Sequence, residues 1–239
     1  YKNRKCAILA NIPFRQSGAL MKAILFLTTL LIVPGITNAY EDVLAYLYEP
    51  NLEPPDELIF KNVKIHARNA EFTSAQALSQ DLLDSLDISK KLNRYTQGQV
   101  IVNDGILNIA QGEYLLGLSI VERGIRILEA KTNPFDNILI KGLMAKGIGQ
   151  MQLNSFIDAE DTFRRAQHIT HRQLGVYNQT QLPIISFVTA TNIRRGKTFS
   201  ADQQQRFRLK VAELNFGPES TDILPTLVVL GSYFSTRGG

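Results

Sequence analysis

The strongest constraint on the fold is that the chain repeats small and turn-forming residues with a period of 42. Several residue types that agree on one period are typical of an array of structural repeats. Such arrays stack equal units side by side, so the repeat predicts an architecture before any single helix is assigned. Three series carry the period: Gly112, Asn154, Gly196 and Gly238; Gly117, Ala159 and Ala201; and Gly105, Gly147 and Gly231, with Thr189 in the remaining position.

Between these positions, apolar residues recur at helical spacing. The stretch from Ile138 to Arg172 contains two amphipathic helices with Asn154-Ser155 as the turn between them. The same pattern predicts helices near 73–92, 99–111, 113–130, 137–152, 155–172, 181–194 and 199–215. Because the loops are short, paired helices should run antiparallel. We therefore expect an all-α fold, an α-solenoid of helix hairpins over 72–239, with units at about 91–132, 133–174, 175–216 and a truncated unit at 217–239.

Residues 40–71 precede the clearest repeats and are acidic, with Pro54-Pro55 blocking a continuous helix. We expect an extended arm with at most one short helical turn. The composition favours a solvated linker, and a docking segment is the alternative. The end of this region, from Leu58 to Ala70, fits a degenerate first helix of the array.

The N-terminal part has the plan of an export signal. Residues 21–39 contain Lys22, an eleven-residue apolar run and small residues before a cleavage point after Ala39. The run is too short to span a bilayer, so we expect no stable membrane anchor after cleavage and a periplasmic or secreted product. Residues 1–20 precede Met21 and are interpreted as an upstream or non-native segment; they hold the only cysteine, Cys6.

The spacing of small and bulky residues resembles the tetratricopeptide repeat (TPR). The 42-residue period is similar to the longer form found in kinesin light chains, and the segments at 175–184 and 216–225 resemble exported bacterial TPR proteins. The third unit has Gln205 and Arg208 where the pattern has Phe and Ala. The matching positions are Gly105, Gly112, Tyr114 and Gly117 in the first unit, Gly147, Asn154, Phe156, Ala159, Phe163 and Ala166 in the second, and Gly196 and Ala201 in the third.

The resemblance implies a right-handed superhelix whose first helices line a concave groove that binds a protein or peptide. In this register the groove is mostly apolar, and two cationic side chains, Lys141 and Arg194, could hold a carboxylate or a peptide terminus. The alternative is that several of these residues simply belong to the core. The predicted groove residues are Val102, Ile106, Ile109, Lys141, Met144, Ile148, Met151, Ser186, Ala190, Ile193 and Arg194.

Charge is segregated along the chain. Beyond residue 39 there are 21 basic and 22 acidic residues, so the formal charge of +4 comes from the first 39 residues, which contain Lys2, Arg4, Lys5, Arg15 and Lys22 and no acid. Residues 40–87 have a net charge of −7 and residues 164–213 one of +7. Such runs are usually solvated helix faces, and the alternatives are an acidic partner or head-to-tail pairing with the acidic arm. A basic groove with stacking aromatics is not evident, so we expect no nucleic-acid partner.

No catalytic motif emerges. His168 and His171 lie three residues apart but lack further ligands, and no phosphate loop or nucleophile elbow is present. We therefore expect no enzyme activity, no cofactor and no metal. The predicted function is a non-catalytic interaction scaffold. The alternatives are an oligomerisation module that uses its open C-terminal flank, or an array that delivers substrate to a catalytic domain beyond Gly239.

Overall fold

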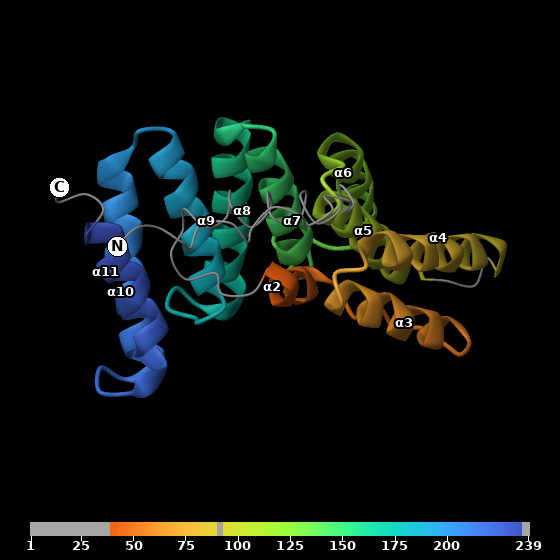
Figure 1. Cartoon of the computed structure of the whole chain (residues 1–239), viewed down its shortest axis with the longest axis horizontal. Helices are drawn as coiled ribbons and strands as arrows, with labels where there is room; N and C mark the ends of the chain where they lie inside the picture. The colour runs from red at the N-terminus through yellow and green to blue at the C-terminus, as the bar shows by residue number, and fades with distance from the viewer. Residues whose placement is uncertain (1–38, 90–92, 236–239) are drawn as a thin grey trace, which may run out of the picture.

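The computed structural model describes residues 39–89 and 93–235, and every regular element within them is helical. This confirms the all-α expectation. The helices follow one another along the long axis of the molecule, from α3 and α4 at one end to α10 and α11 at the other (Figure 1). They are α2 (Ala39–Tyr46), α3 (Asp56–Arg68), α4 (Phe72–Ser89), α5 (Arg94–Ala110), α6 (Tyr114–Glu129), α7 (Leu139–Gln152), α8 (Phe156–Leu174), α9 (Gln181–Arg194), α10 (Thr198–Phe216), the 3₁₀ turn η1 (Thr221–Ile223) and α11 (Leu224–Ser235).

The seven helices expected between 73 and 215 are all present among the described residues. Most ends agree within two residues, and the largest difference is at α5, which begins at Arg94 rather than near residue 99. The expected leader lies outside the described residues except for Ala39, as does the turn position Gly238. Over the described residues no helix is long and apolar enough to cross a membrane.

Four links between successive helices share one geometry. Each contains three residues, and the middle residue has a positive φ: 61° at Ala70, 86° at Gly112, 61° at Asn154 and 71° at Gly196. In each link the next residue donates its N–H to the carbonyl five residues back, for example from Ser155 to Gln150 at 2.9 Å. This is the Schellman ending of a helix, which favours glycine or asparagine at the left-handed position. The 42-residue series of turn residues therefore marks equivalent bends.

Close approach between α5 and α6 explains why glycines occupy the positions where these two helices cross. A Cβ on Gly105 would lie 2.8 Å from the main-chain nitrogen of Val121, and one on Gly117 would lie 2.9 Å from the carbonyl oxygen of Gly105. Two main chains can approach this closely only where side chains are absent. In the next pair, a Cβ on Gly147 would lie 2.4 Å from the Phe163 ring.

The acidic region departs from the sequence expectation. Residues 39–46 form α2, and residues 56–68 form α3, the degenerate first helix that the pattern allowed. The expectation of a solvated linker is wrong for residues 43–52, because four apolar side chains there are buried. Their exposed fractions are 6% for Val43, 2% for Leu47, 3% for Tyr48 and 9% for Leu52.

The α9–α10 pair has a polar interior. Gln205 and Arg208, which replace Phe and Ala of the repeat pattern, are 1% and 9% exposed. The Arg208 guanidinium donates to Ser186 Oγ, and burial lowers the pKa of Arg208. Within the described residues, Gln205 Oε1 and Arg208 Nε have no hydrogen-bond partner. Unpaired buried polar atoms cost free energy, so the interior between α9 and α10 is less well hydrogen-bonded than those of the neighbouring helix pairs.

Candidate binding face

The residues predicted to line a groove are mostly covered. On α5, Val102, Ile106 and Ile109 are at most 5% exposed, and on α7, Met144 and Ile148 are 2% and 8% exposed. Lys141 and Met151 are half-buried. On α9, Ser186 and Ala190 are buried, whereas Ile193 and Arg194 are exposed. The structure therefore leaves only the end of α9 open among these predicted positions.

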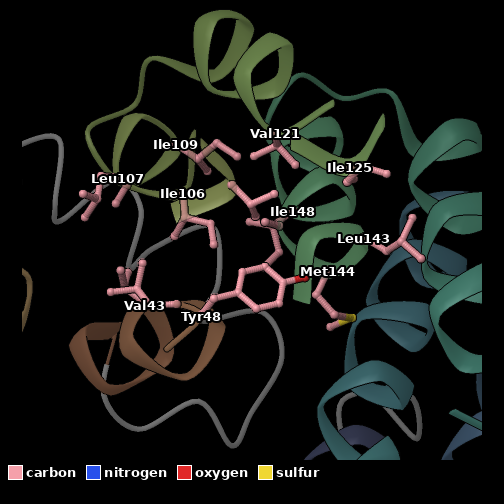
Figure 2. Close-up of a cluster of buried hydrophobic side chains, with 14 of the residues drawn as sticks. Val43, Tyr48, Ile106, Leu107, Ile109, Val121, Ile125, Leu143, Met144 and Ile148 are labelled. Carbon is pink, nitrogen blue, oxygen red and sulfur yellow. The ribbon is translucent and has the colours of Figure 1, made fainter. Parts of the chain in front are cut away.

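The cover comes from the chain itself. The segment of residues 43–52, here called the arm, consists of the end of α2 and the loop towards α3, and α2 lies against α5 and α7 with α3 beside it (Figure 1). Figure 2 shows the Tyr48 ring pointing into the cluster, with Val43 and Ile106 on one side and Met144 and Ile148 on the other. Of the predicted residues, Lys141 contacts this segment directly, and Ile106, Met144 and Ile148 lie beside Tyr48 (Figure 2). The alternative of core packing holds for Ile109, which lies in the α5–α6 crossing, and for Ser186, which is bonded to Arg208.

Asn103 holds the main chain of the arm. Its Oδ1 accepts the N–H of Tyr48 at 2.6 Å, and its Nδ2 donates to the carbonyl of Tyr48 at 3.0 Å. Asn103 is 1% exposed, so both bonds form away from water, where they are expected to be strong. Sequence analysis did not single out Asn103. The available signal was a polar pair, Asn103-Asp104, between the apolar runs Val100–Val102 and Ile106–Leu107.

The Tyr48 hydroxyl is bonded on both sides. It donates to the Ile138 carbonyl and accepts from the N–H of Gly142 at 3.1 Å. Burial raises the pKa of Tyr48, against a lowering by the Gly142 N–H, so the phenol stays protonated and keeps its donor role. A phenylalanine would fill the same space but leave the carbonyl of Ile138 without this donor. The pocket is therefore matched to tyrosine.

Lys141 contacts a peptide carbonyl instead of the carboxylate that was expected. Its ammonium donates to the Leu47 carbonyl at 2.7 Å and lies 5.8 Å from the centre of the Tyr48 ring. Burial lowers the pKa of Lys141, the nearby Glu49 raises it, and Lys64 lowers it further. Glu49 itself pairs with Lys64 at 2.5 Å. Arg194, the second predicted cationic point, lies on the exposed end of α9.

Aromatic contacts extend the arm's environment to α9. The rings of Tyr46 and Phe187 meet edge to face at 6.4 Å, and Phe187 stacks on Phe163 at 5.1 Å. The face in contact with the arm thus includes side chains from α5, α7 and α9, which are the helices that the repeat register selected.

The basic second helices are partly neutralised within the chain. The buried carboxylate of Glu160 on α8 accepts from Arg164 at 2.9 Å, from Lys197 at 2.9 Å and from Arg195. Burial by itself would raise the pKa of Glu160, but the hydrogen bonds and charges of Lys197 and Arg164 bring it below the ordinary value of 4.5. Three of the nine basic residues in 164–213 therefore serve an internal ion-pair cluster.

Replacing Glu160 by glutamine is expected to destabilise the chain by about 1–3 kcal/mol at pH 7, because Arg164, Arg195 and Lys197 lose their shared carboxylate. The effect stays in this range because the three cations are only partly buried and solvent screens their charges. The folded pKa is lowered, so this stabilisation is present above pH 4.5 and is lost as the pH falls through the folded pKa. Urea unfolding of both proteins at pH 7 and pH 3 measures it. A difference in free energy that does not shrink at pH 3 would contradict the assignment.

The two histidines of α8 have separate contacts. His171 Nε2 lies 2.5 Å from Gln181 Oε1, and the His168 ring lies 5.6 Å from the ring of Phe135. Across residues 39–89 and 93–235, no group of three or more His, Cys, Asp or Glu side chains is placed to hold a metal ion.

No protein-family model matches the chain, and no curated protein shows significant similarity to it.

Proposed function

We propose that this chain is a non-catalytic scaffold that binds a protein or peptide segment on the face formed by α5, α7 and α9. The architecture proposed for it is an α-solenoid of TPR type with a right-handed superhelix. Export to the periplasm or the outside is part of the proposal and rests on the leader-like sequence of residues 21–39.

The repeat architecture is supported by the equivalence of the four Schellman turns and by the packing of each helix on the next. Units that repeat their geometry at constant spacing share a continuous core and offer one continuous face. The exposed large side chains Leu115, Ile157 and Phe199 follow the same spacing of 42 residues, one on each second helix.

The observation that carries the function is that this face binds main-chain groups of a segment that leaves its helix at Tyr46 and has no regular secondary structure from Tyr48 on. Residues 48–53 have no regular secondary structure, and the hydrogen bonds to Tyr48 and to the carbonyl of Leu47 come from side chains of α5 and α7. Main-chain hydrogen bonds that give affinity, together with a pocket for a side chain that gives specificity, are a common way of binding a peptide.

A peptide library selected against the chain tests the proposal. Ligands of the face should bind about tenfold more weakly to a variant with Lys141→Gln and Arg194→Gln, since a carbonyl or carboxylate loses its cationic partner. Dissociation constants from fluorescence anisotropy give the comparison.

The matched control carries Arg126→Gln and Lys131→Gln, which remove the same charge from exposed positions at the end of α6. This control should bind the selected peptides as the unmodified chain does. Equal loss in both variants would mean that net charge, not the face, determines binding, and the proposed function would fall.

A structural role is the second candidate, and α11 favours it. Its side chains Leu224 and Val228 are 53% and 62% exposed, which is typical of a surface that packs on another protein. Light scattering after size exclusion, on the chain and on Val228→Asp, tests it. A dimer that the substitution dissociates supports self-association, and a monomer in both cases excludes it.

A further inference from the structure

We propose that the arm is a displaceable internal ligand, and that the partner recognised by this face carries a segment of the same chemistry: a peptide without regular secondary structure that has an apolar residue, a tyrosine and an acidic residue in sequence. This inference rests on the proposed function and adds to it the ligand class and a means of regulation. In this chain the sequence is Leu47-Tyr48-Glu49.

Leu47 and Tyr48 have their partners on α5 and α7, whereas the partner of Glu49 is on α3. Leu47 is 2% exposed and its carbonyl accepts from Lys141 at 2.7 Å. Tyr48 is held at its main chain by Asn103 and at its hydroxyl by Ile138 and Gly142. Glu49 pairs with Lys64 at 2.5 Å. The contacts to the main chain of Tyr48 accept any residue there, whereas the hydroxyl contacts select tyrosine.

The arm also resembles a ligand in how it is attached. Only the short stretch from Glu53 to Pro55 separates it from α3, so its effective concentration at the face is on the order of millimolar. A peptide with an intrinsic dissociation constant of about 10 μM would then bind the closed chain roughly a hundredfold more weakly. Weakening the arm, without changing its receptor, should restore the intrinsic affinity.

The ion pair between Glu49 and Lys64, at the polar end of the arm, is accessible to water. The side chains of Lys64 and Glu49 are 38% and 68% exposed, and Lys141 is half-buried. Ion pairs exposed to this degree contribute little to stability. Release of the arm therefore begins at this exposed ion pair, which exchanges easily with water. A competing peptide can then replace the buried contacts of Leu47 and Tyr48.

The test uses the full chain and a fluorescein-labelled peptide with the sequence of residues 43–53. Tyr48→Ala weakens the internal ligand and leaves Asn103, Ile138 and Gly142 in place. We expect this variant to bind the peptide at least tenfold more tightly than the unmodified chain. The peptide in which tyrosine is replaced by alanine should not bind, and adding Asn103→Leu to Tyr48→Ala should abolish the gain.

Circular dichroism of each variant shows whether its helices are retained, so that a failure to bind the peptide can be distinguished from a failure to fold. If Tyr48→Ala retains its helicity but gains no affinity for the peptide, the proposal is overturned. If the variant loses its helicity, the peptide should raise its melting temperature in trans, and failure to do so shows that the arm is a fixed part of the core. If the arm peptide binds to the variant but the library yields no ligand, the arm is still a displaceable internal ligand, whereas the proposed function is contradicted.

Discussion

Replacing Gly117 by alanine is expected to lower the free energy of unfolding by about 1–3 kcal/mol, because the added methyl group has no space in the α5–α6 crossing. Its Cβ would lie 2.7 Å from Ile109 Cγ1 and 2.9 Å from two main-chain atoms, the carbonyl oxygen of Gly105 and the nitrogen of Ile109. A side chain can rotate away, but main-chain atoms move only if the two helices separate. Separation would loosen Val121 and other core residues packed beside the crossing.

The matched control is the same substitution at Gly231. This residue lies within α11, where a Cβ would meet no heavy atom within 4 Å. Alanine there should stabilise the chain by about 0.5–1 kcal/mol, since it has a higher helix propensity than glycine. Urea unfolding of the three proteins gives both values. Equal effects at Gly117 and Gly231 would show that helix propensity, rather than close approach, sets the cost of the substitution.

The glycine pattern also explains which part of the fold could be predicted from sequence. Gly112, Asn154 and Gly196 were expected at equivalent turns, and all three have left-handed backbone in the same hydrogen-bonded link. A left-handed turn position depends on the local backbone, so it restricts the residue at that position mainly to glycine or asparagine. Ala70 has the same φ without that mark, because the surrounding helix ends impose the conformation on an ordinary residue.

The arm could not be predicted in the same way. The acids and prolines of residues 40–58, in which it lies, indicate a solvated segment, and its apolar residues Val43, Leu47, Tyr48 and Leu52 follow no single helical or strand period. Their burial depends on a surface made by α5 and α7, more than 50 residues further along the chain. The groove residues were therefore identified by their place in the repeat, whereas their occupant and the role of Asn103 required the tertiary structure.

The buried carboxyl of Asp104, next to Asn103 on α5, lowers the stability of the fold by an amount that depends on pH. It is 3% exposed, and in the described part of the chain its Oδ1 has no hydrogen-bond partner. Burial raises the pKa of Asp104 to about 6, in spite of the opposing charge of Arg123 and a hydrogen bond from Ser79. The folded chain therefore holds this proton more tightly than the unfolded chain, whose carboxyl has its ordinary value of 3.8.

Asp104→Asn should consequently stabilise the chain by about 2–3 kcal/mol at pH 8 and have little effect at pH 4, since each pKa unit corresponds to about 1.4 kcal/mol. Below pH 3.8 the carboxyl is neutral in both states and carries no penalty. As the pH rises towards 6 the unfolded chain ionises first, which favours unfolding, and above pH 6 the penalty is complete. Urea unfolding at the two pH values measures the difference, with Asp81→Asn as a control at an exposed position on α4. If Asp104→Asn gave the same change at pH 4 and pH 8, the carboxylate would not be the source of the cost, and the lost hydrogen bond to Ser79 would have to account for it instead.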